Sequence, residues 1–125
     1  MSDRDAVLDG LRRDLEAAAD AVTPPPVLRF RSMFGGVGVY ADGPMFAAIT
    51  EAGLALKLPP ADRETLIEHW GTVPFQYRPN GPISKNKILI PDEVRTDPER
   101  LAPWLERSIA FAASAAASPR RKDAG

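Results

Sequence analysis

The sequence predicts an α+β domain in which helices pack mainly on one face of an antiparallel sheet of about five strands. Three observations lead to this prediction. Segments with helical periodicity begin and end the chain. Between them, residues 31–58 contain short strand-like segments separated by glycine-containing turns. A further helical segment and two more strand-like segments follow, and this order of helices and strands is typical of the α+β class.

The overall composition limits the classes of function. A length of 125 residues suits one domain with a modest core. Its 16 Lys and Arg residues and 17 Asp and Glu residues give a net charge of −1, which does not support general electrostatic binding of nucleic acid but leaves a local patch open. The absence of cysteine excludes disulfides, thiol catalysis and Cys-based metal sites. No apolar run approaches the roughly 20 residues of a membrane span, and the acidic N-terminus is unlike a signal peptide, so we expect a cytoplasmic protein without a membrane partner.

Residues 2–22 are predicted to form the first helix. Ser2 can cap it, and apolar side chains recur at spacings of three, four and seven residues. This stripe contains Val7, Leu8, Leu11, Leu15, Ala18 and Val22. The run Thr23-Pro-Pro-Pro26 ends the helix because proline lacks the backbone N–H. The expected organisation is a helix and proline linker over residues 1–26, a domain over residues 27–117, and a disordered basic tail over residues 118–125.

A three-stranded meander is predicted before residue 58, after an extended lead-in over residues 27–32. Because Pro44 cannot donate a hydrogen bond, we expect a four-residue loop closed by Tyr40 and Met45. The second turn, Glu51-Ala-Gly53, fits a three-residue hairpin that pairs Thr50 with Leu54. The remaining expected cross-strand pairs are Val39–Phe46, Val37–Ala48, Gly38–Ala47 and Gly36–Ile49.

The two faces of this meander differ in composition. One face is uniformly apolar and is expected to carry the helices: Val37, Val39, Phe46, Ala48, Leu54, Leu56 and Leu58. The other face is small and mixed: Gly36, Gly38, Ala47 and Lys57. We expect a contact surface on this second face, with Tyr40, Met45 and Ile49 as anchors. In the lead-in, Arg29 and Arg31 share one side and are expected near the rim of that surface.

The second half of the chain contains two more helices and two more strands. A helix is predicted over residues 60–70, after Pro59-Pro60, with Leu66, Ile67 and Trp70 buried. Residues 75–77 and 85–90 are predicted to be antiparallel strands. Asp97-Pro98 begins the last helix, which runs to about residue 117. Because Pro103 lacks an N–H, we expect an irregular or 3₁₀ turn at its start.

Short motifs along most of the chain form a specific combination. They are Met33-Phe-Gly-Gly-Val-Gly-Val-Tyr40, Asp42-Gly43, Met45-Phe-Ala47, Leu56-Lys-Leu58, Arg63, Gly71, Pro74-Phe-Gln-Tyr77, Pro91-Asp-Glu-Val94, Asp97-Pro98 and Trp104. Together they resemble the N-terminal domain of the TfoX/Sxy family, over roughly residues 27–115. The resemblance implies a bacterial, non-enzymatic domain without cofactors. The regulators that name the family are required for competence gene expression and usually carry a second, C-terminal domain. This chain ends without one, so we expect a single-domain member of the family.

Possible sites of chemistry have simpler structural interpretations. Gly35, Gly36 and Gly38 lack the following helix of a phosphate-binding loop, so a role in packing is favoured. His69 is the only histidine and has no cysteine to complete a metal site. The carboxylates at positions 92, 93 and 97 fit turns and helix caps. We therefore predict no catalytic, cofactor-binding or metal-binding residues, and no enzymatic activity.

Basic residues suggest a second kind of surface. Arg78, Lys85 and Lys87 lie on or near the last two predicted strands, and could combine with Arg29 and Arg31. The alternative is a sheet edge protected by charge. The predicted function is a regulatory or protein-interaction module with a protein partner, and a homodimer also fits. The alternatives are a nucleic-acid-binding regulator using the basic residues, and a small-ligand binder or enzyme.

Overall fold

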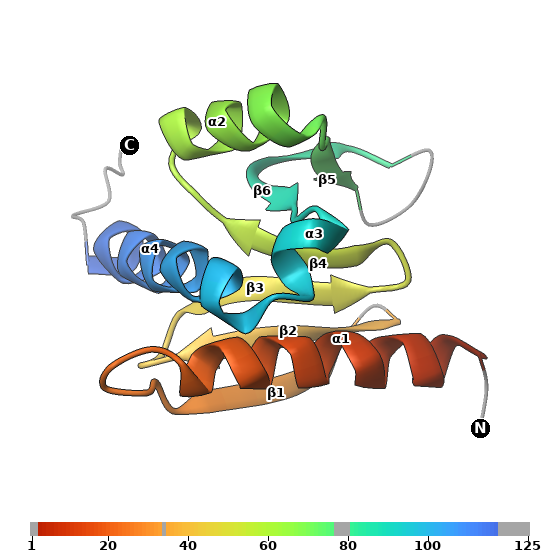
Figure 1. Ribbon diagram of the computed structural model, residues 1–125, viewed down its shortest axis with the longest axis vertical. Coiled ribbons are helices and arrows are strands. Elements are labelled where there is room, and N and C mark those ends of the chain that lie inside the picture. Colours follow the sequence, from red (N-terminus) through yellow and green to blue (C-terminus); the bar gives the residue numbers. More distant parts are fainter. Residues whose placement is uncertain (1–2, 34, 77–80, 118–125) are drawn as a thin grey trace.

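The computed structural model describes residues 3–33, 35–76 and 81–117 of the chain. They form a six-stranded antiparallel sheet with the order β1-β2-β3-β4-β6-β5, and four helices (Figure 1). The strands are β1 (Leu28–Met33), β2 (Gly36–Ala41), β3 (Met45–Thr50), β4 (Gly53–Lys57), β5 (Pro74–Gln76) and β6 (Ile83–Leu89). The helices are α1 (Asp3–Asp20), α2 (Pro60–Trp70), α3 (Asp92–Arg95) and α4 (Pro98–Ala117). The predicted α+β class is confirmed, with six strands instead of about five.

The helices pack mainly on one face of the sheet, as predicted. In Figure 1, α1, α3 and α4 lie in front of the central strands. Each of the four helices contributes buried apolar side chains to one core with this face, and the largest contributions are Leu15, Leu66, Val94, Leu101 and Leu105. The helices are also joined by charge, since Arg95 of α3 pairs with Asp14 of α1, and Arg107 of α4 lies 2.9 Å from Asp62 of α2. We call the opposite side of the sheet the open face.

The expected lead-in is a full strand. β1 pairs with β2 in a regular antiparallel register from Leu28↔Ala41 to Met33↔Gly36. The predicted three-stranded meander is confirmed as β2, β3 and β4, and the lead-in adds β1 to it as a fourth strand. Leu28 and Phe30 alternate with Arg29 and Arg31, which is the two-residue period of a strand with one apolar face.

The turn between β2 and β3 is tighter than predicted. Asp42 and Gly43, with φ of 56° and 111°, form a two-residue loop in place of the expected four-residue loop. The Ala41 N–H donates to the Pro44 carbonyl over 3.2 Å. Pro44 lacks an N–H but still accepts a hydrogen bond, so one of the two closing bonds of the loop is kept.

A β-bulge changes the register of β3. The predicted pair Tyr40↔Met45 is confirmed, but the next pairs are Val39↔Ala47, Gly38↔Ala48 and Val37↔Ile49. Phe46 is thus an extra residue without a partner on β2, and the predicted pairs beyond it were wrong by one position. The Ser108 hydroxyl of α4 donates to the Phe46 carbonyl over 3.0 Å, in a fully buried position. This bond satisfies a buried carbonyl at the bulge.

The bulge also changes which side chains face the helices. Phe46, Ala47 and Ile49 all lie in the helix-facing core, whereas Ala48 lies on the open face in a small cluster with Ala55 and Phe75. The prediction had Ala48 toward the helices and Ala47 and Ile49 on the open face, and these three placements were wrong. The second turn is also shorter than expected, because Thr50 pairs with Gly53 and not with Leu54.

Two helices of the second half depart from prediction in detail. α2 has the expected bounds, but only Leu66 is buried, and Ile67 and Trp70 are about 40 % exposed. α4 is continuous through Pro103, without the expected irregular turn. Pro103 removes one hydrogen bond, and both it and Glu99, whose carbonyl would have accepted that bond, lie on the exposed side of the helix. The predicted capping by Asp97 is confirmed, since its Oδ1 accepts from the Glu99 N–H over 3.1 Å.

The strands after α2 agree with the prediction. β5 and β6 pair in antiparallel fashion, and β6 also pairs with β4. Residues 77 and 78, to which a strand end and a basic group were assigned, lie outside the described residues. So does the tail over residues 118–125.

The bond from Ser108 to the bulge predicts a measurable stability effect. Ser108→Ala leaves a buried carbonyl without a donor, so we expect the free energy of unfolding to fall by about 1–3 kcal/mol. Ser32→Ala removes an exposed hydroxyl from β1 and should change it by less than about 0.5 kcal/mol. Urea unfolding of both variants measures the difference. Equal effects would contradict the proposed role of Ser108.

Candidate interaction surface

The open face is built by alternate residues of five strands. The register brings together cationic side chains at both ends of the sheet and small or apolar side chains between them. The principal members of this face are Arg29, Arg31, Met33, Gly38, Tyr40, Met45, Ala48, Ala55, Lys57, Lys85, Lys87 and Leu89. The four described helices are packed on the opposite side. The centre of the open face is nevertheless buried, because Ala48 and Ala55 pack in a cluster with Phe75 of β5. The members available to a partner are the exposed Arg29, Arg31 and Lys85 and the half-buried Tyr40.

Charge is strongly segregated on this sheet. The six strands contain five cationic residues, Arg29, Arg31, Lys57, Lys85 and Lys87, and no carboxylate. All five alternate onto the open face. The acidic residues that give the chain its net charge of −1 lie in helices and connections. The open face is thus positive although the whole chain is slightly acidic.

One end of the open face combines arginine, tyrosine and methionine. Arg29 lies opposite Tyr40, with its guanidinium 5.5 Å from the centre of the ring. Both arginines are exposed and Tyr40 is half-buried. Arg29, Arg31 and Tyr40, with Phe30, line a shallow pocket of about 420 Å³. Four of the five residues predicted to form the contact surface therefore lie close together, and Met45 is the fourth because it pairs with Tyr40.

Gly38 leaves room for two methionine side chains to pack over β2 at this end of the face. A Cβ at Gly38 would lie 2.8 Å from Met33 Cε and 3.0 Å from Met45 Sδ, so the two methionines meet over its backbone. The alternative of a phosphate-binding loop finds no support, because Gly38 lies inside β2 and no helix follows it. The glycine serves close packing.

Ile49 does not belong to this surface. It was predicted as an anchor, but its side chain is completely buried in the helix-facing core. The reason is the bulge at Phe46, since one extra residue moves every later side chain of the strand to the other face.

The other end of the open face carries lysines. Lys57 lies opposite Lys87, and Lys87 is only 8 % exposed. Burial lowers the pKa of both ammonium groups, and the charge of Lys57 lowers the pKa of Lys87 further. Lys85 is exposed on the same strand. Because β2, β3 and β4 separate β1 from β6, the expected composite basic surface is split into an arginine end and a lysine end of one face.

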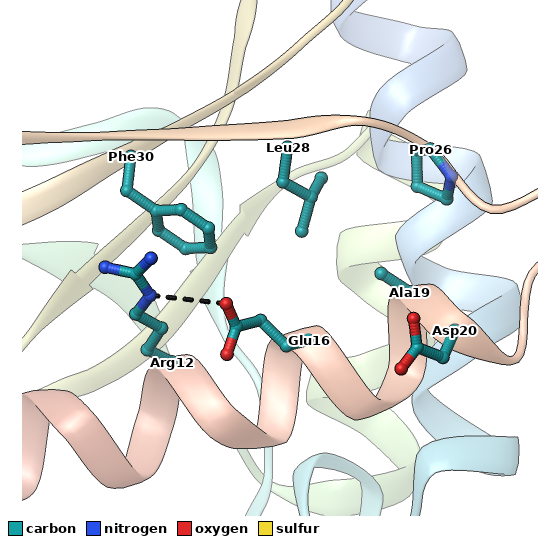
Figure 2. Close-up of a pocket in the computed structure, with 7 residues that line it drawn as sticks. All are labelled: Arg12, Glu16, Ala19, Asp20, Pro26, Leu28 and Phe30. Atoms are coloured by element: carbon teal, nitrogen blue, oxygen red, sulfur yellow. Dashed lines mark hydrogen bonds and ion pairs between the residues drawn. The ribbon is translucent and has the colours of Figure 1, made fainter.

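A cleft between α1 and β1 was not predicted. It has a volume of about 450 Å³ and is lined by Arg12, Glu16, Ala19, Asp20, Pro26, Leu28 and Phe30. Figure 2 shows Leu28 and Phe30 directed from β1 toward α1. The Arg12 guanidinium lies 3.9 Å from the centre of the Phe30 ring and bonds to Glu16 over 3.4 Å. Sequence periodicity assigns these residues to their elements but does not place the helix beside the strand.

Groups for metal or acid–base chemistry do not converge in the described part of the chain. There, no three His, Cys, Asp or Glu side chains are placed to hold a metal ion. His69 is exposed near the end of α2. Asp97 caps α4, as predicted, whereas Asp92 lies in the first turn of α3 and forms an ion pair with Arg95.

Comparison with known proteins identifies one family. The model of the TfoX N-terminal domain matches residues 20–112, which include all six strands, α2, α3 and most of α4. No curated protein matches the chain.

The buried lysines predict a pH-dependent stability. A lysine whose pKa is lowered in the folded state releases its proton more easily there than in the unfolded chain. The free energy of unfolding therefore rises as pH increases from the lowered pKa toward the ordinary value of 10.5. We expect the free energy of unfolding to increase over this alkaline window. Lys87→Met should reduce the increase, whereas Lys85→Met, which removes an exposed lysine from the same strand, should not. Urea unfolding at about pH 7 and about pH 10 tests this, and identical pH dependence in both variants would contradict it.

Proposed function

We propose that this chain, which belongs to the TfoX N-terminal domain family, is a non-enzymatic regulatory domain that binds another protein through the open face. The observation that carries the proposal is the positive open face, with Arg29, Tyr40 and two methionines gathered at one end. The family supports a regulatory role in general terms. A transcriptional or competence-type process in the bacterial cytoplasm is the specific role we infer.

The chemistry of this surface suits protein recognition. Arginine, tyrosine and methionine are enriched at protein interfaces because they combine apolar area with directional polar groups. Here Arg29 stacks near Tyr40, which restrains both side chains before a partner arrives. The small residues Gly38, Ala48 and Ala55 at the centre of the face are buried, so a partner would meet the exposed arginines and the half-buried Tyr40.

Substitutions on the open face test the proposal. Tyr40→Ala and Arg31→Glu are expected to lose partners that the parent chain captures from lysate of its own cell, because they remove apolar area and reverse a charge. Arg13→Glu, on the exposed side of α1, is the matched control and should keep them. Quantitative pull-down, with circular dichroism to check folding, measures the effect. Retention of every partner by both open-face variants would reject the proposal.

Nucleic-acid binding is the second candidate, and the five cations without a carboxylate on the strands favour it. Binding of this kind should weaken steeply with salt, because counterions are released from the phosphates. Arg29→Glu and Arg31→Glu should each weaken binding to all sequences and reduce the slope of log affinity against log salt by about one or more. An electrophoretic shift assay at low salt, with Arg13→Glu as control, tests this. No shift with single- or double-stranded DNA or RNA would remove the candidate.

A further inference from the structure

We propose that β1 is a docking strand, to which an extended acidic segment of the partner protein adds as a seventh strand of the sheet. This inference rests on the proposed protein-binding function and specifies the partner's chemistry. An edge strand presents backbone N–H and C=O groups at every second residue, and an extended peptide can pair with them.

The two edges of the sheet differ in their capacity for such pairing. β5, at one edge, has only three residues, an irregular register with β6, and Pro74, which has no N–H. β1, at the other edge, has six residues, no proline, and an uninterrupted register with β2. The described residues supply no strand beyond it. Therefore β1 is the edge that can accept another strand.

Charge favours an acidic segment. Side chains of an added strand that point to the open face would lie beside Arg29 and Arg31, because neighbouring strands bring equivalent residues together on one face. Both arginines are exposed, and within the described residues neither forms an ion pair. No carboxylate from β2 lies on the same face to compensate them. Two carboxylates in alternate positions of the added strand would do so.

The opposite side of the added strand would meet the cleft between α1 and β1. There it would lie beside Leu28 and Phe30, which are half-buried and point toward α1 (Figure 2). Arg12 is held by Glu16 and by the Phe30 ring, so that part of the wall is already neutralised. The cleft of about 450 Å³ has room for side chains of modest size. The expected segment therefore alternates acidic residues with small apolar residues.

A second copy of the chain fits β1 poorly. In a symmetric antiparallel pair of β1 strands, directly opposite residues must share a face. The two registers of this kind that pair the most residues of β1 are centred on Phe30 and on Arg31. The first places Arg29 opposite Arg31 of the other copy twice, and the second places Arg31 opposite itself. Like charges directly opposite destabilise strand pairing, so the arginines disfavour self-association at this edge and favour an acidic partner.

A peptide binding experiment on the full chain tests the proposal. The probe is a fluorescent peptide of alternating glutamate and valine, and the comparison peptide alternates lysine and valine. We expect the parent to bind the glutamate peptide, and the double variant Arg29→Glu/Arg31→Glu to bind it at least about tenfold more weakly while gaining affinity for the lysine peptide. Arg13→Glu should behave as the parent. Circular dichroism confirms that each variant is folded.

Backbone pairing has its own readouts. Hydrogen exchange of the β1 amides should slow when the glutamate peptide is bound, and N-methylation of every second peptide residue should abolish binding. Unchanged affinity for the glutamate peptide after charge reversal would overturn the proposal. So would slower hydrogen exchange elsewhere but not in β1, or binding of the N-methylated peptide. Binding of an oligonucleotide or of a second copy, but not of the glutamate peptide, would overturn it as well. If the open-face substitutions Tyr40→Ala and Arg31→Glu still remove the native partner while β1 shows none of these effects, the proposed function stands and this docking mode fails.

Discussion

The arrangement of side chains on the sheet depends on the β-bulge at Phe46, whose carbonyl accepts a buried hydrogen bond from Ser108. A bulge leaves backbone groups without ladder partners, and inside the core such groups need another donor. α4 supplies it, because its buried side faces β3 at that point. In this way one hydroxyl on a helix stabilises an extra residue in a strand. The extra residue in turn decides which side chains of β3 face the helices.

The position of the bulge determines which residues of β3 lie in the core and which lie on the open face. With Phe46 as an extra residue, Ala47 and Ile49 complete the helix-facing core, and Ala48 joins Ala55 on the open face. The helix-facing side of β2, β3 and β4 is apolar and packs against the helices. The open face keeps small residues at its centre and cations at its ends. The net charge of the chain does not reveal the positive charge of this face, because the acidic residues lie in helices and connections and balance it.

Prediction from sequence succeeded where the signal is local. The bounds of α1, α2 and α4 were predicted to within a few residues, because apolar spacing, proline and capping residues act over one or two turns of helix. Arg29 and Arg31 were predicted to share one side of the lead-in, since alternation along a strand is also local, and to lie near the rim of the surface that contains Tyr40. Prediction failed at Ile49, because nothing in residues 45–50 distinguishes a bulged strand from a regular one. Ile67 and Trp70 failed for a related reason: their exposure depends on where α2 lies.

The sequence by itself determined the α+β class, the order of the elements, the family resemblance and the contrast between two faces of the meander. The class, the order of the elements and the contrast between the faces follow from side-chain periods and turn residues, which each segment carries independently of the others. The resemblance rests on the combination of short motifs between Met33 and Trp104. Only the tertiary structure decided the addition of β1 to the meander, the bulge, the burial of Lys87 beside Lys57 and the cleft between α1 and β1. Each of these arises where segments distant in the chain meet, as Ser108 meets Phe46, and the energy of such contacts depends on positions that no single segment specifies.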